Sequence, residues 1–599
     1  MHNFILFIKE FHIYKKSELI NAIASFSKKQ LAVFMVILLT AFVLLIILLG
    51  KINQSFMVEV PVSGGSITEG IVGVPTLVNP VSSFSNADKD LTILVYSGLM
   101  RKNNEGEFIP DLAESFPTIS PNGLNYTFIL KKDLKFHNGM RITVDDIIFT
   151  IEKIKNSTIK SPRKMEWDGV TISKIDENTI MFTLSEPYIS FLDNTTLGIL
   201  SSQLWKDVKV SEFNLSPLNT KAIGSGPYKI KSVIKDENGL PEIYKLERFN
   251  NFSLGKPLIK KINIISYANE KDLLKALLSN SIDQAGGINP ENANILKKYN
   301  HEIHTATLPR IFGVFLNKNN NKIFGEPSVI EAIDQAIDRQ MIIDQVLLGY
   351  GSILHNPIPP KIAEDKLIEK YKIPNTEEAN NILEKAGWTK GEDGIREKGG
   401  ATTKTTTKKV GSKTFTQTVK TATPKTRLSF SIITGDTSDF KNIANLIKDQ
   451  LVKIGVEVNV KIYETGQLNQ LIKDREYEAL LFGQSINHES NIYSYWHSSQ
   501  ATDPGLNIAM YNNKKVDVLL ETIQKTLKVE DRINKYLDLG NEFNNNIGAV
   551  LIYSPLYLYA TSPQLKNIFL DSVTVPSDRF SLVYKWAANT DKVWKIFNK

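Results

Sequence analysis

The residues best suited to chemistry lie in the segment Phe482–Gln500, which reads FGQSINHESNIYSYWHSSQ. His488, Glu489 and His497 have the donors to ligate a first-row metal ion, or to act as general acid and base. The tyrosines, the amides and Trp496 of the same segment suit the wall of a binding site instead. The three ionisable residues lack the spacing of a metal-ligand motif, so the sequence favours a binding wall.

Other residues that invite a catalytic reading lack the partners that catalysis needs. Asp145 and Asp146 are adjacent, which turns their side chains to different faces of a helix. His137 has no cluster of partners in the sequence, and a structural histidine is favoured there. The GSGPY segment after Ile223 lacks the Lys-Ser/Thr of a phosphate loop. The sequence therefore predicts a protein that is not an enzyme, with no cofactor and no bound metal.

The composition restricts the class of protein. Of the 599 residues, 42% are hydrophobic, which is enough for large cores in two or three lobes. The formal net charge of +7 is spread along the chain without a basic stripe, so nucleic acid is not an expected partner. The chain has no cysteine, which excludes disulfides, thiolate metal sites and a lipid-modified N-terminal cysteine.

The strongest local pattern is the uninterrupted apolar run Leu31–Gly50, long enough to cross a bilayer, which takes about 20 residues. Lysine pairs at 15–16 and 28–29 precede it, whereas Lys51 stands nearly alone after it. This charge bias places the N-terminus in the cytoplasm and the rest of the chain outside. A cleaved signal peptide would have a shorter apolar core nearer to Met1, so a retained membrane anchor is favoured.

The elements that must position the polar residues alternate between strands and helices. A strand is predicted over SITEGIVG, and a helix over TVDDIIFTIEKIKN with Thr143 as its N-cap. Later, RLSFSIITGD, VEVNVKIYE and EALLFGQ alternate with helical segments, as in an α/β lobe. A Thr/Lys-rich segment at 396–427 is too polar to bury a core of its own and is expected to be a disordered insertion.

Two α/β units separated in sequence need connections between them. We expect the chain to cross near Phe312–Asn317 and to return near Ile552–Pro555. Two crossings make a double-stranded hinge, and the cleft between two hinged lobes is a natural ligand site.

Several stretches, in order, resemble the extracytoplasmic solute-binding proteins of family 5, the peptide and nickel class that feeds ABC transporters. The most specific block is DLAESFPTISPNGLNYTFILKKDLKFHNGMRITVDDIIFTIEKI. Further matches are LVNPVSSFSNADKDLTILVYSGLM, GSGPYKI, VIEAIDQAIDRQMIIDQVLLGYG, ILEKAGW and YEALLFG. The resemblance covers residues 66–595 apart from the Thr/Lys-rich insertion.

The resemblance implies an α/β, two-lobed class II periplasmic-binding-protein fold of the cluster C type, with an extra subdomain. One transmembrane helix would precede it. The expected parts are a cytoplasmic tail at 1–30, the transmembrane helix at 31–50, a linker at 51–65, lobe I at 66–98 plus 224–312 plus 555–599, its extra subdomain at 99–223, and lobe II at 313–554 with the insertion at 396–427.

The implied function is that of a membrane-anchored solute-binding protein in the periplasm or on the outer cell surface. It would capture oligopeptides or a similar solute between its lobes by hinge closure, and deliver them to an ABC transporter permease. A monomer is expected. Two alternatives stay open: a binder of nickel or metal chelates, and a surface scaffold or sensor that kept the fold without transport.

The resemblance also indicates where the solute would lie. In peptide-binding relatives an aspartate in the segment matching Phe482–Asn491 pairs with the α-ammonium group of the peptide. Here Glu489 could supply that charge, Asn491 could have removed it, or Glu489 is a solvated loop carboxylate. Trp496 has the strongest alternative as a core residue. The residues expected to line the cleft are Asn79, Ser82, Phe84, Ser85, Phe312, Asn317, Gly483, Gln484, Ser485, Asn487, Glu489, Asn491, Trp496 and Tyr557.

Overall fold

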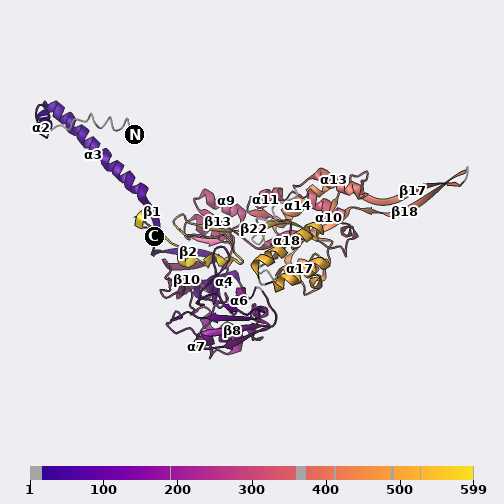
Figure 1. Ribbon diagram of the computed structural model, residues 1–599, viewed down its shortest axis with the longest axis horizontal. Coiled ribbons are helices and arrows are strands. Elements are labelled where there is room, and N and C mark those ends of the chain that lie inside the picture. Colours follow the sequence, from indigo (N-terminus) through magenta and orange to yellow (C-terminus); the bar gives the residue numbers. More distant parts are fainter. Residues whose placement is uncertain are drawn as a thin grey trace. The chain divides into compact units, whose positions relative to one another are not determined.

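The computed structural model describes residues 16–188, 190–358, 373–410, 413–486, 491–526 and 528–597. The chain divides into two compact units (Figure 1). Unit 1 comprises Met1–Val62 and Asn589–Lys599, and unit 2 comprises Ser63–Ala588.

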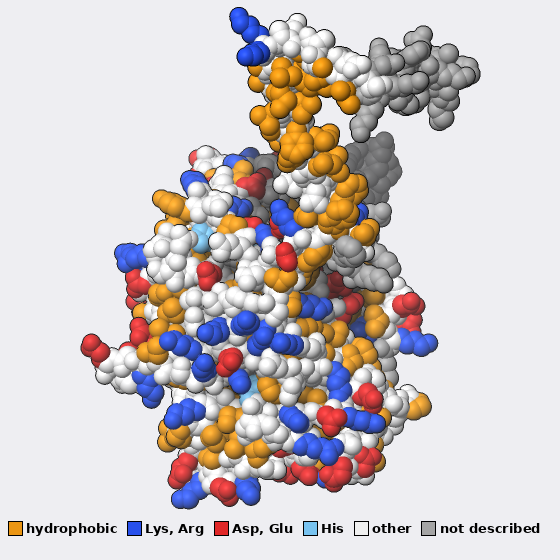
Figure 2. Space-filling model, turned by 90° about the vertical axis from the view of Figure 1, so that its left-hand side faces the viewer, with side chains coloured by type: hydrophobic (Ala, Val, Ile, Leu, Met, Phe, Trp, Pro, Cys, Tyr) orange, Lys and Arg blue, Asp and Glu red, His pale blue; other side chains and the backbone are white. Residues whose placement is uncertain are grey.

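Unit 1 is built around one long apolar helix. Helix α2 (Lys16–Ala24) precedes α3 (Lys28–Phe56), which contains the whole predicted apolar run. By length and composition α3 is able to cross a membrane, and none of its residues is buried. Figure 2 shows hydrophobic side chains gathered along this helix. Its N-terminus is closed by a capping box between Ser27 and Gln30.

Two predicted boundaries in this unit are wrong. The predicted linker at 51–65 is structured, because α3 continues to Phe56 and residues Met57–Val62 form strand β1. Strand β1 pairs antiparallel with β23 (Asn589–Trp594), so the last residues of the chain belong to unit 1 rather than to lobe I. The pairing joins segments more than 500 residues apart, and no local pattern reveals such a partner.

Unit 2 contains a 12-stranded sheet whose order is β20-β19-β21-β14-β22-β12-β2-β11-β10-β9, with β13 and β15 also paired to β22. We call the half around β2 lobe I and the half around β14 lobe II. The strands of lobe I are β2 (Gly64–Val72), β9 (Tyr228–Lys235), β10 (Pro241–Arg248), β11 (Ile259–Tyr267), β12 (Gln284–Gly286) and β13 (Glu302–Thr307). Those of lobe II are β14 (Arg310–Leu316), β15 (Gly351–Ile353), β19 (Ser429–Gly435), β20 (Glu457–Tyr463) and β21 (Ala479–Ser485).

Strand β22 (Ala549–Thr561) belongs to both lobes. Its residues 549–553 pair with β14, and its residues 556–561 pair with β13. The hydrophobic cores are distributed in the same way: one large cluster surrounds Ile262 and Leu91 in lobe I. Two others lie in lobe II, around Val314 and around Leu480. Because β14 alternates between these two clusters, the lobe II sheet is covered on both faces.

Helices pack against the strands of both lobes. The helices of lobe I are α4 (Asn86–Val95), α8 (Glu270–Leu278) and α9 (Pro290–Lys298). Those of lobe II are α10 (Pro327–Ala336), α11 (Arg339–Val346), α13 (Thr376–Lys385), α14 (Ser438–Val452), α15 (Thr465–Asp474), α16 (Asn491–Trp496), α17 (Lys514–Lys525) and α18 (Val529–Asn545).

A smaller layer is inserted into lobe I within the predicted range 99–223. It holds a four-stranded sheet in the order β5-β6-β8-β7 and a two-stranded one, β3-β4. Helix α5 (Val144–Lys155) begins after Thr143, as predicted, and Asp146 in its first turn accepts hydrogen bonds from the backbone and hydroxyl of Thr143. The strands are β3 (Met100–Lys102), β4 (Phe108–Pro110), β5 (Thr118–Ile119), β6 (Asn125–Ile129), β7 (Val170–Lys174) and β8 (Thr179–Leu184); short helices are α6 (Phe191–Asn194) and α7 (Ser202–Trp205).

The Thr/Lys-rich segment is not disordered, which corrects the prediction. Residues Arg396–Val410 form β17 and residues Lys413–Arg427 form β18, an antiparallel pair that extends from lobe II (Figure 1). Threonine is β-branched and favours extended backbone, and a hairpin satisfies its backbone hydrogen bonds without a core. Its base is fixed by the buried Arg396, whose guanidinium donates to the carbonyls of Ile454 and Trp388.

A buried ionic network ties β2, α4 and the 3₁₀ turn Pro576–Phe580 together in lobe I. Arg579 Nη2 lies 2.8 Å from Glu69 Oε1, and Nη1 lies 2.8 Å from Asp90 Oδ1. The Tyr559 hydroxyl donates to Glu69 Oε2 at 2.8 Å. All four side chains are buried, so this network fixes the first strand of lobe I against the first helix.

Candidate functional site

The carboxyl ends of the lobe II strands share one edge of the sheet. Strands β19, β20 and β21 are parallel, so their carboxyl ends, Gly435, Tyr463 and Ser485, point toward the same edge of the sheet, where β21 continues furthest. The loops that follow lead into α14, α15 and α16, and α14 is capped by Thr437. In open α/β sheets ligands bind outside the carboxyl ends of the strands.

The two segments that join the lobes leave from this same edge. Strand β14 is antiparallel to β21 and begins there, with Arg310 opposite Ser485. The lobe II part of β22 ends there, with Tyr553 opposite Phe312. The crossings are thus at 307–310 and 553–556. The first predicted crossing, Phe312–Asn317, is wrong because Phe312 to Leu316 are already paired with β21 inside lobe II.

The carboxyl ends of the lobe I strands also lie at the edge where the chain crosses between the lobes. Strands β11 and β12 are parallel to β2, so Val72, Tyr267 and Gly286 lie toward one edge. Strand β13 ends at Thr307, and its partner β22 enters at Leu556. The carboxyl edges of both lobes therefore lie at the two crossing strands, which is the arrangement that a hinged binding protein needs.

Aromatic rings cover the lobe II side of the crossing. The Phe312 ring stacks on Tyr553, with centroids 4.8 Å apart and planes 7° apart, and it contacts Phe440 at 6.0 Å. Gly483 makes room for this ring, because a Cβ at Gly483 would lie 2.5 Å from Phe312 Cε1. Phe312 remains partly accessible. Sequence reasoning pointed to Phe312 and Gly483 but missed Tyr553 and Phe440, whose only signal is an aromatic residue at a strand end or in a helix.

The other two predicted residues of β21, Gln484 and Ser485, make hydrogen bonds within lobe II. Gln484 Nε2 donates to the Leu506 carbonyl at 3.2 Å, and its Oε1 has no hydrogen-bond partner in the part of the chain that the structure describes. The Ser485 carbonyl accepts a hydrogen bond from the Tyr495 hydroxyl at 2.8 Å. Both residues thus tie the end of β21 to the segments that follow it.

Three of the four predicted residues of lobe I have structural roles. Asn79 is fully buried and donates to Asn219 Oδ1 at 2.9 Å, and Ser82 donates to Asn214 at 2.6 Å. Ser85 is the N-cap of α4 and accepts a hydrogen bond from Asp88 N. Phe84 differs, because 56% of its side chain is exposed. An exposed aromatic residue after the first strand of lobe I is available to a ligand.

Trp496, Asn317 and Tyr557 are buried, which corrects their placement in the cleft. Trp496 packs in the lobe II core against Phe315 and Phe543. Asn317 donates to the Arg475 carbonyl at 3.0 Å. Tyr557 is 3% exposed, and its hydroxyl fills the space above Gly286. In each case residues distant in sequence enclose the side chain.

Two of the predicted residues, Asn487 and Glu489, lie outside the described residues. Asn491 is the first residue of α16, at the end of the loop that follows β21. The role of Glu489 or Asn491 in meeting a charged ligand stays a prediction.

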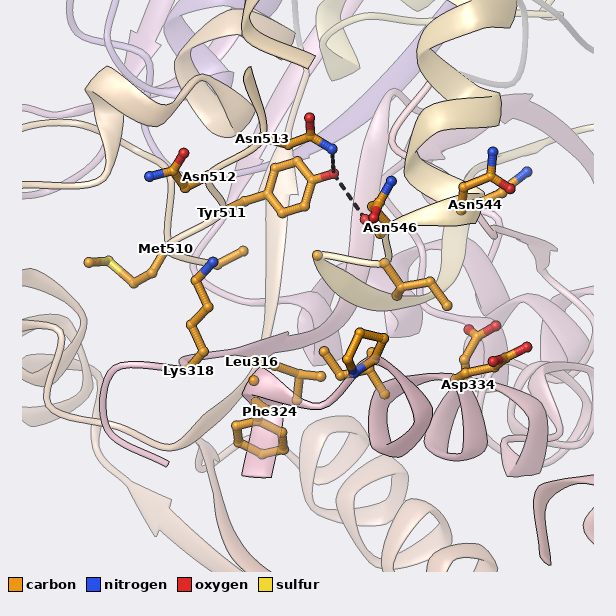
Figure 3. A pocket seen from close by; sticks show the side chains of 18 of the residues that line it. Leu316, Lys318, Phe324, Asp334, Met510, Tyr511, Asn512, Asn513, Asn544 and Asn546 are labelled. Atoms are coloured by element: carbon orange, nitrogen blue, oxygen red, sulfur yellow. Dashed lines mark hydrogen bonds between the residues drawn. The ribbon is translucent and has the colours of Figure 1, made fainter. Parts of the chain in front are cut away.

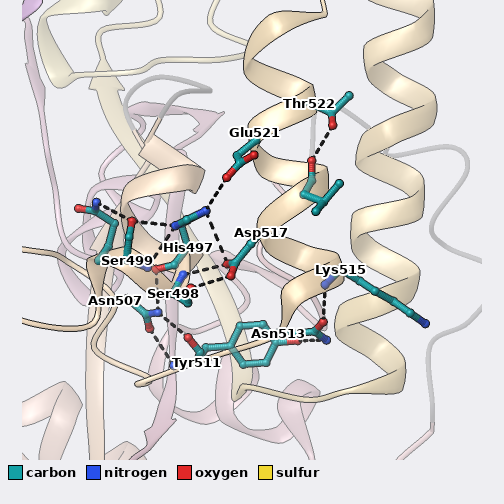
Figure 4. Close-up of polar contacts among 12 residues, drawn as sticks. His497, Ser498, Ser499, Asn507, Tyr511, Asn513, Lys515, Asp517, Glu521 and Thr522 are labelled. Carbon is teal, nitrogen blue, oxygen red and sulfur yellow. Dashed lines mark hydrogen bonds and ion pairs between the residues drawn. The ribbon is translucent and has the colours of Figure 1, made fainter.

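His497 anchors a polar network between α16 and α17 (Figure 4). Its Nδ1 accepts the Ser499 N–H at 3.1 Å, and its Nε2 lies 3.4 Å from Glu521 Oε1 and 3.8 Å from Asp517 Oδ1. The Ser498 backbone and hydroxyl both donate to Asp517. No group of three His, Cys, Asp or Glu side chains in the described residues could hold a metal ion. This histidine therefore braces two helices.

A pocket of about 670 Å³ lies at the opposite end of the lobe II sheet (Figure 3). It opens where β14 ends at Leu316 and where β22 is about to begin after Gly548. Its wall is rich in amides, and none of the described residues singled out from the sequence lines it. The amide side chains on its wall are Asn512, Asn513, Asn544, Asn545 and Asn546.

His137, the other residue that invited catalysis, has a structural role. Its Nε2 donates to the Gly226 carbonyl at 3.0 Å, and its Nδ1 accepts the Gly224 N–H at 3.4 Å. Both glycines are needed, since a Cβ on either would lie within 2.6 Å of the backbone of Val95. Burial lowers the pKa of His137 to about 4.

Between pH 6.5 and 4 the unfolded chain binds a proton at His137 that the folded chain excludes. We therefore expect the free energy of unfolding to fall as the pH falls through this range. Above pH 6.5 the titration of His137 should add no pH dependence. Denaturant unfolding of wild type and of His137→Gln at several pH values measures the effect. The variant should show a flatter pH dependence, and equal slopes would refute the assignment.

Comparison with known proteins gives one family. The model of bacterial extracellular solute-binding proteins, family 5 Middle, matches residues 107–504. The oligopeptide-binding protein AppA of Bacillus subtilis is 28% identical over 513 residues, which cover 83% of this chain and 87% of AppA.

Solved structures show the same fold. The structure of Bacillus subtilis AppA in complex with a nonapeptide has a TM-score of 0.61 at 24% identity, and covers 88% of this chain and 99% of that one. The structure of NikZ from Campylobacter jejuni with Ni(L-His) has a TM-score of 0.65 at 23% identity, and covers 87% and 99%. The two-lobed periplasmic-binding-protein fold is confirmed. The chain belongs to the bacterial extracellular solute-binding proteins of family 5, the non-enzymatic, extracytoplasmic binding proteins of ABC transporters in the peptide and nickel class.

Proposed function

We propose that this protein captures oligopeptides between its two lobes and delivers them to an ABC transporter permease. The observation that carries the proposal is that the carboxyl edges of both lobes of the sheet lie at the crossings 307–310 and 553–556. The oligopeptide-binding name of the Bacillus subtilis relative favours a peptide as the solute.

Capture rests on closure about the crossing strands. A peptide that contacts both edges stabilises the closed state, because it gains contacts there that the open state lacks. The Phe312 ring, which is partly accessible and stacks on the buried Tyr553, offers an apolar surface beside the hinge, and the exposed Phe84 offers another from lobe I.

We also propose that α3 is retained as a membrane anchor. The helix continues past the apolar run to Phe56, and the residues after it pair with the C-terminal strand. A cut after Gly50 would remove most of α3 from a unit that includes it. The intact mass of the mature protein tests this: a chain that begins after Gly50 would contradict it.

Native mass spectrometry of the full-length protein, purified in detergent, tests the solute. We expect a mixture of short peptides to be released from the protein. A bound nickel ion that EDTA removes would contradict the peptide proposal, and so would a protein that arrives empty and shows no thermal shift with a peptide library.

The charge at the peptide N-terminus tests Glu489. If Glu489 pairs with the α-ammonium group, calorimetry should show that a free peptide binds more tightly than its N-acetylated form, and that Glu489→Gln abolishes the preference. A pair of this kind contributes roughly 1.5–3 kcal/mol, which is tenfold or more in Kd. If the wild type binds the free and the N-acetylated peptide with equal affinity, Glu489 does not pair with the α-ammonium group.

A further inference from the structure

The end of α3 and the end of the chain form a small aromatic cluster in unit 1. In the antiparallel register of β1 and β23, Met57 lies opposite Trp594, which brings the end of β23 back to the last turn of α3. The indole N–H of Trp594 donates to Asn53 Oδ1 at 2.9 Å. The Trp594 and Phe56 rings stack with centroids 6.4 Å apart.

This cluster is exposed although its side chains are apolar. Trp594 is 45% exposed and Phe56 57%, and Ile596, two residues after Trp594 in the chain, is 72% exposed. The other five tryptophans of the chain are at most 1% exposed. Several apolar side chains exposed together at one place indicate a surface that another apolar phase covers.

The length of α3 indicates which phase that is. Its 29 residues span about 43 Å, at 1.5 Å per residue. A bilayer is about 40–45 Å thick with its headgroup layers, and about 30 Å without them. When the apolar run fills the hydrocarbon, Asn53 lies about 4.5 Å beyond it, within the outer headgroup layer, and Phe56 lies about 9 Å beyond it, at the outer edge of that layer. Tryptophan is enriched at this level, because its ring is apolar and its N–H is polar.

We propose that the C-terminal segment Asn589–Ile596 is a second membrane-contacting element, with Trp594 in the headgroup layer beside the end of α3. The inference rests on the proposed retention of α3. Lys51, Lys592 and Lys595 are exposed and lie within two residues of Asn53 or Trp594 in the chain, and lysines at the membrane surface extend their ammonium groups toward the lipid phosphates. The chain then reaches the membrane through two hydrogen-bonded strands instead of one flexible tether.

Trp594 fluorescence in phosphatidylcholine nanodiscs tests the proposal with the full-length protein. Lipids brominated near the carbonyl end of the acyl chain should quench part of the tryptophan emission, and lipids brominated deep in the chain should quench less. The five buried tryptophans should keep their emission. Trp594→Phe keeps the aromatic ring and should abolish the quenching.

Quenching that is absent from the wild type, or unchanged in Trp594→Phe, would overturn the proposal. The intact mass of the same sample separates this failure from a failure of the anchor. A chain of full mass with no quenching refutes the membrane contact of Trp594 alone, whereas a chain that lacks residues 1–50 refutes the retained anchor first.

Discussion

Replacing Arg579 with leucine is expected to lower the free energy of unfolding of unit 2 by about 3–5 kcal/mol. The guanidinium is the only cation in contact with the buried Glu69 and Asp90 among the described residues. Burial opposes the charge of Arg579, but Asp90, Tyr557 and Glu69 outweigh it and hold its pKa well above the ordinary value. The variant would leave two carboxylates buried without their cation.

The pH dependence of this loss identifies its cause. Burial already raises the pKa of Glu69 and Asp90 beside Arg579, and loss of the cation raises it further, so their protons are bound more tightly in the folded than in the unfolded state. The loss should therefore be largest above neutral pH and shrink toward pH 4. Denaturant unfolding measures it.

Arg427→Leu is the matched control for Arg579→Leu. Arg427 also contacts two carboxylates, Asp393 and Glu457, but at the surface, and little change is expected. A loss in Arg579→Leu that is within error of this control would show that the network does not hold lobe I together.

Replacing Gly483 with alanine is expected to weaken peptide binding at least tenfold, which corresponds to about 1.4 kcal/mol. The new Cβ would lie 2.5–2.9 Å from three atoms of the Phe312 ring. That ring is stacked on Tyr553 and bounded by Phe440, so it must leave its position at the hinge edge. Overpacking of this kind costs typically about 1–3 kcal/mol. Calorimetric titration with a co-purified peptide measures the affinity.

Two further variants separate the binding effect from general instability. Gly466→Ala adds the same methyl group where nothing lies within 4 Å, and should bind as the wild type does. Gly483→Ala combined with Phe312→Leu removes the ring that clashes, and should recover part of the affinity. Wild-type affinity in Gly483→Ala would exclude the Phe312 edge from the binding site.

Sequence patterns predicted the elements whose signals are local. The apolar run of α3 and the N-cap of α5 at Thr143 were both read from residues a few positions apart. The prediction of disorder for the Thr/Lys-rich segment was wrong for a local reason too. It relied on the polarity of the segment and overlooked the preference of threonine for strands. The hairpin needs no core, because β17 and β18 satisfy each other's backbone hydrogen bonds.

The candidate site could be predicted only in outline. The order of strands and the resemblance to family 5 placed the end of β21 and Phe312 at the hinge. Asn79, Trp496 and Tyr557 were assigned to the cleft because their residue types suit ligands, yet all three are buried. A strand or loop shows which residues are polar or aromatic, but not which segment will cover them.

The amino-acid sequence by itself determined the family, the α/β class, the apolar helix and the lack of cysteine. These follow from patterns within short windows and from their order along the chain. Only the tertiary structure decided that Asn79 bonds Asn219, that β1 pairs with β23, and that Trp594 returns to the end of α3. The physical reason is that burial, pairing and exposure depend on partners 140 to 541 residues away, which contribute nothing to the local pattern.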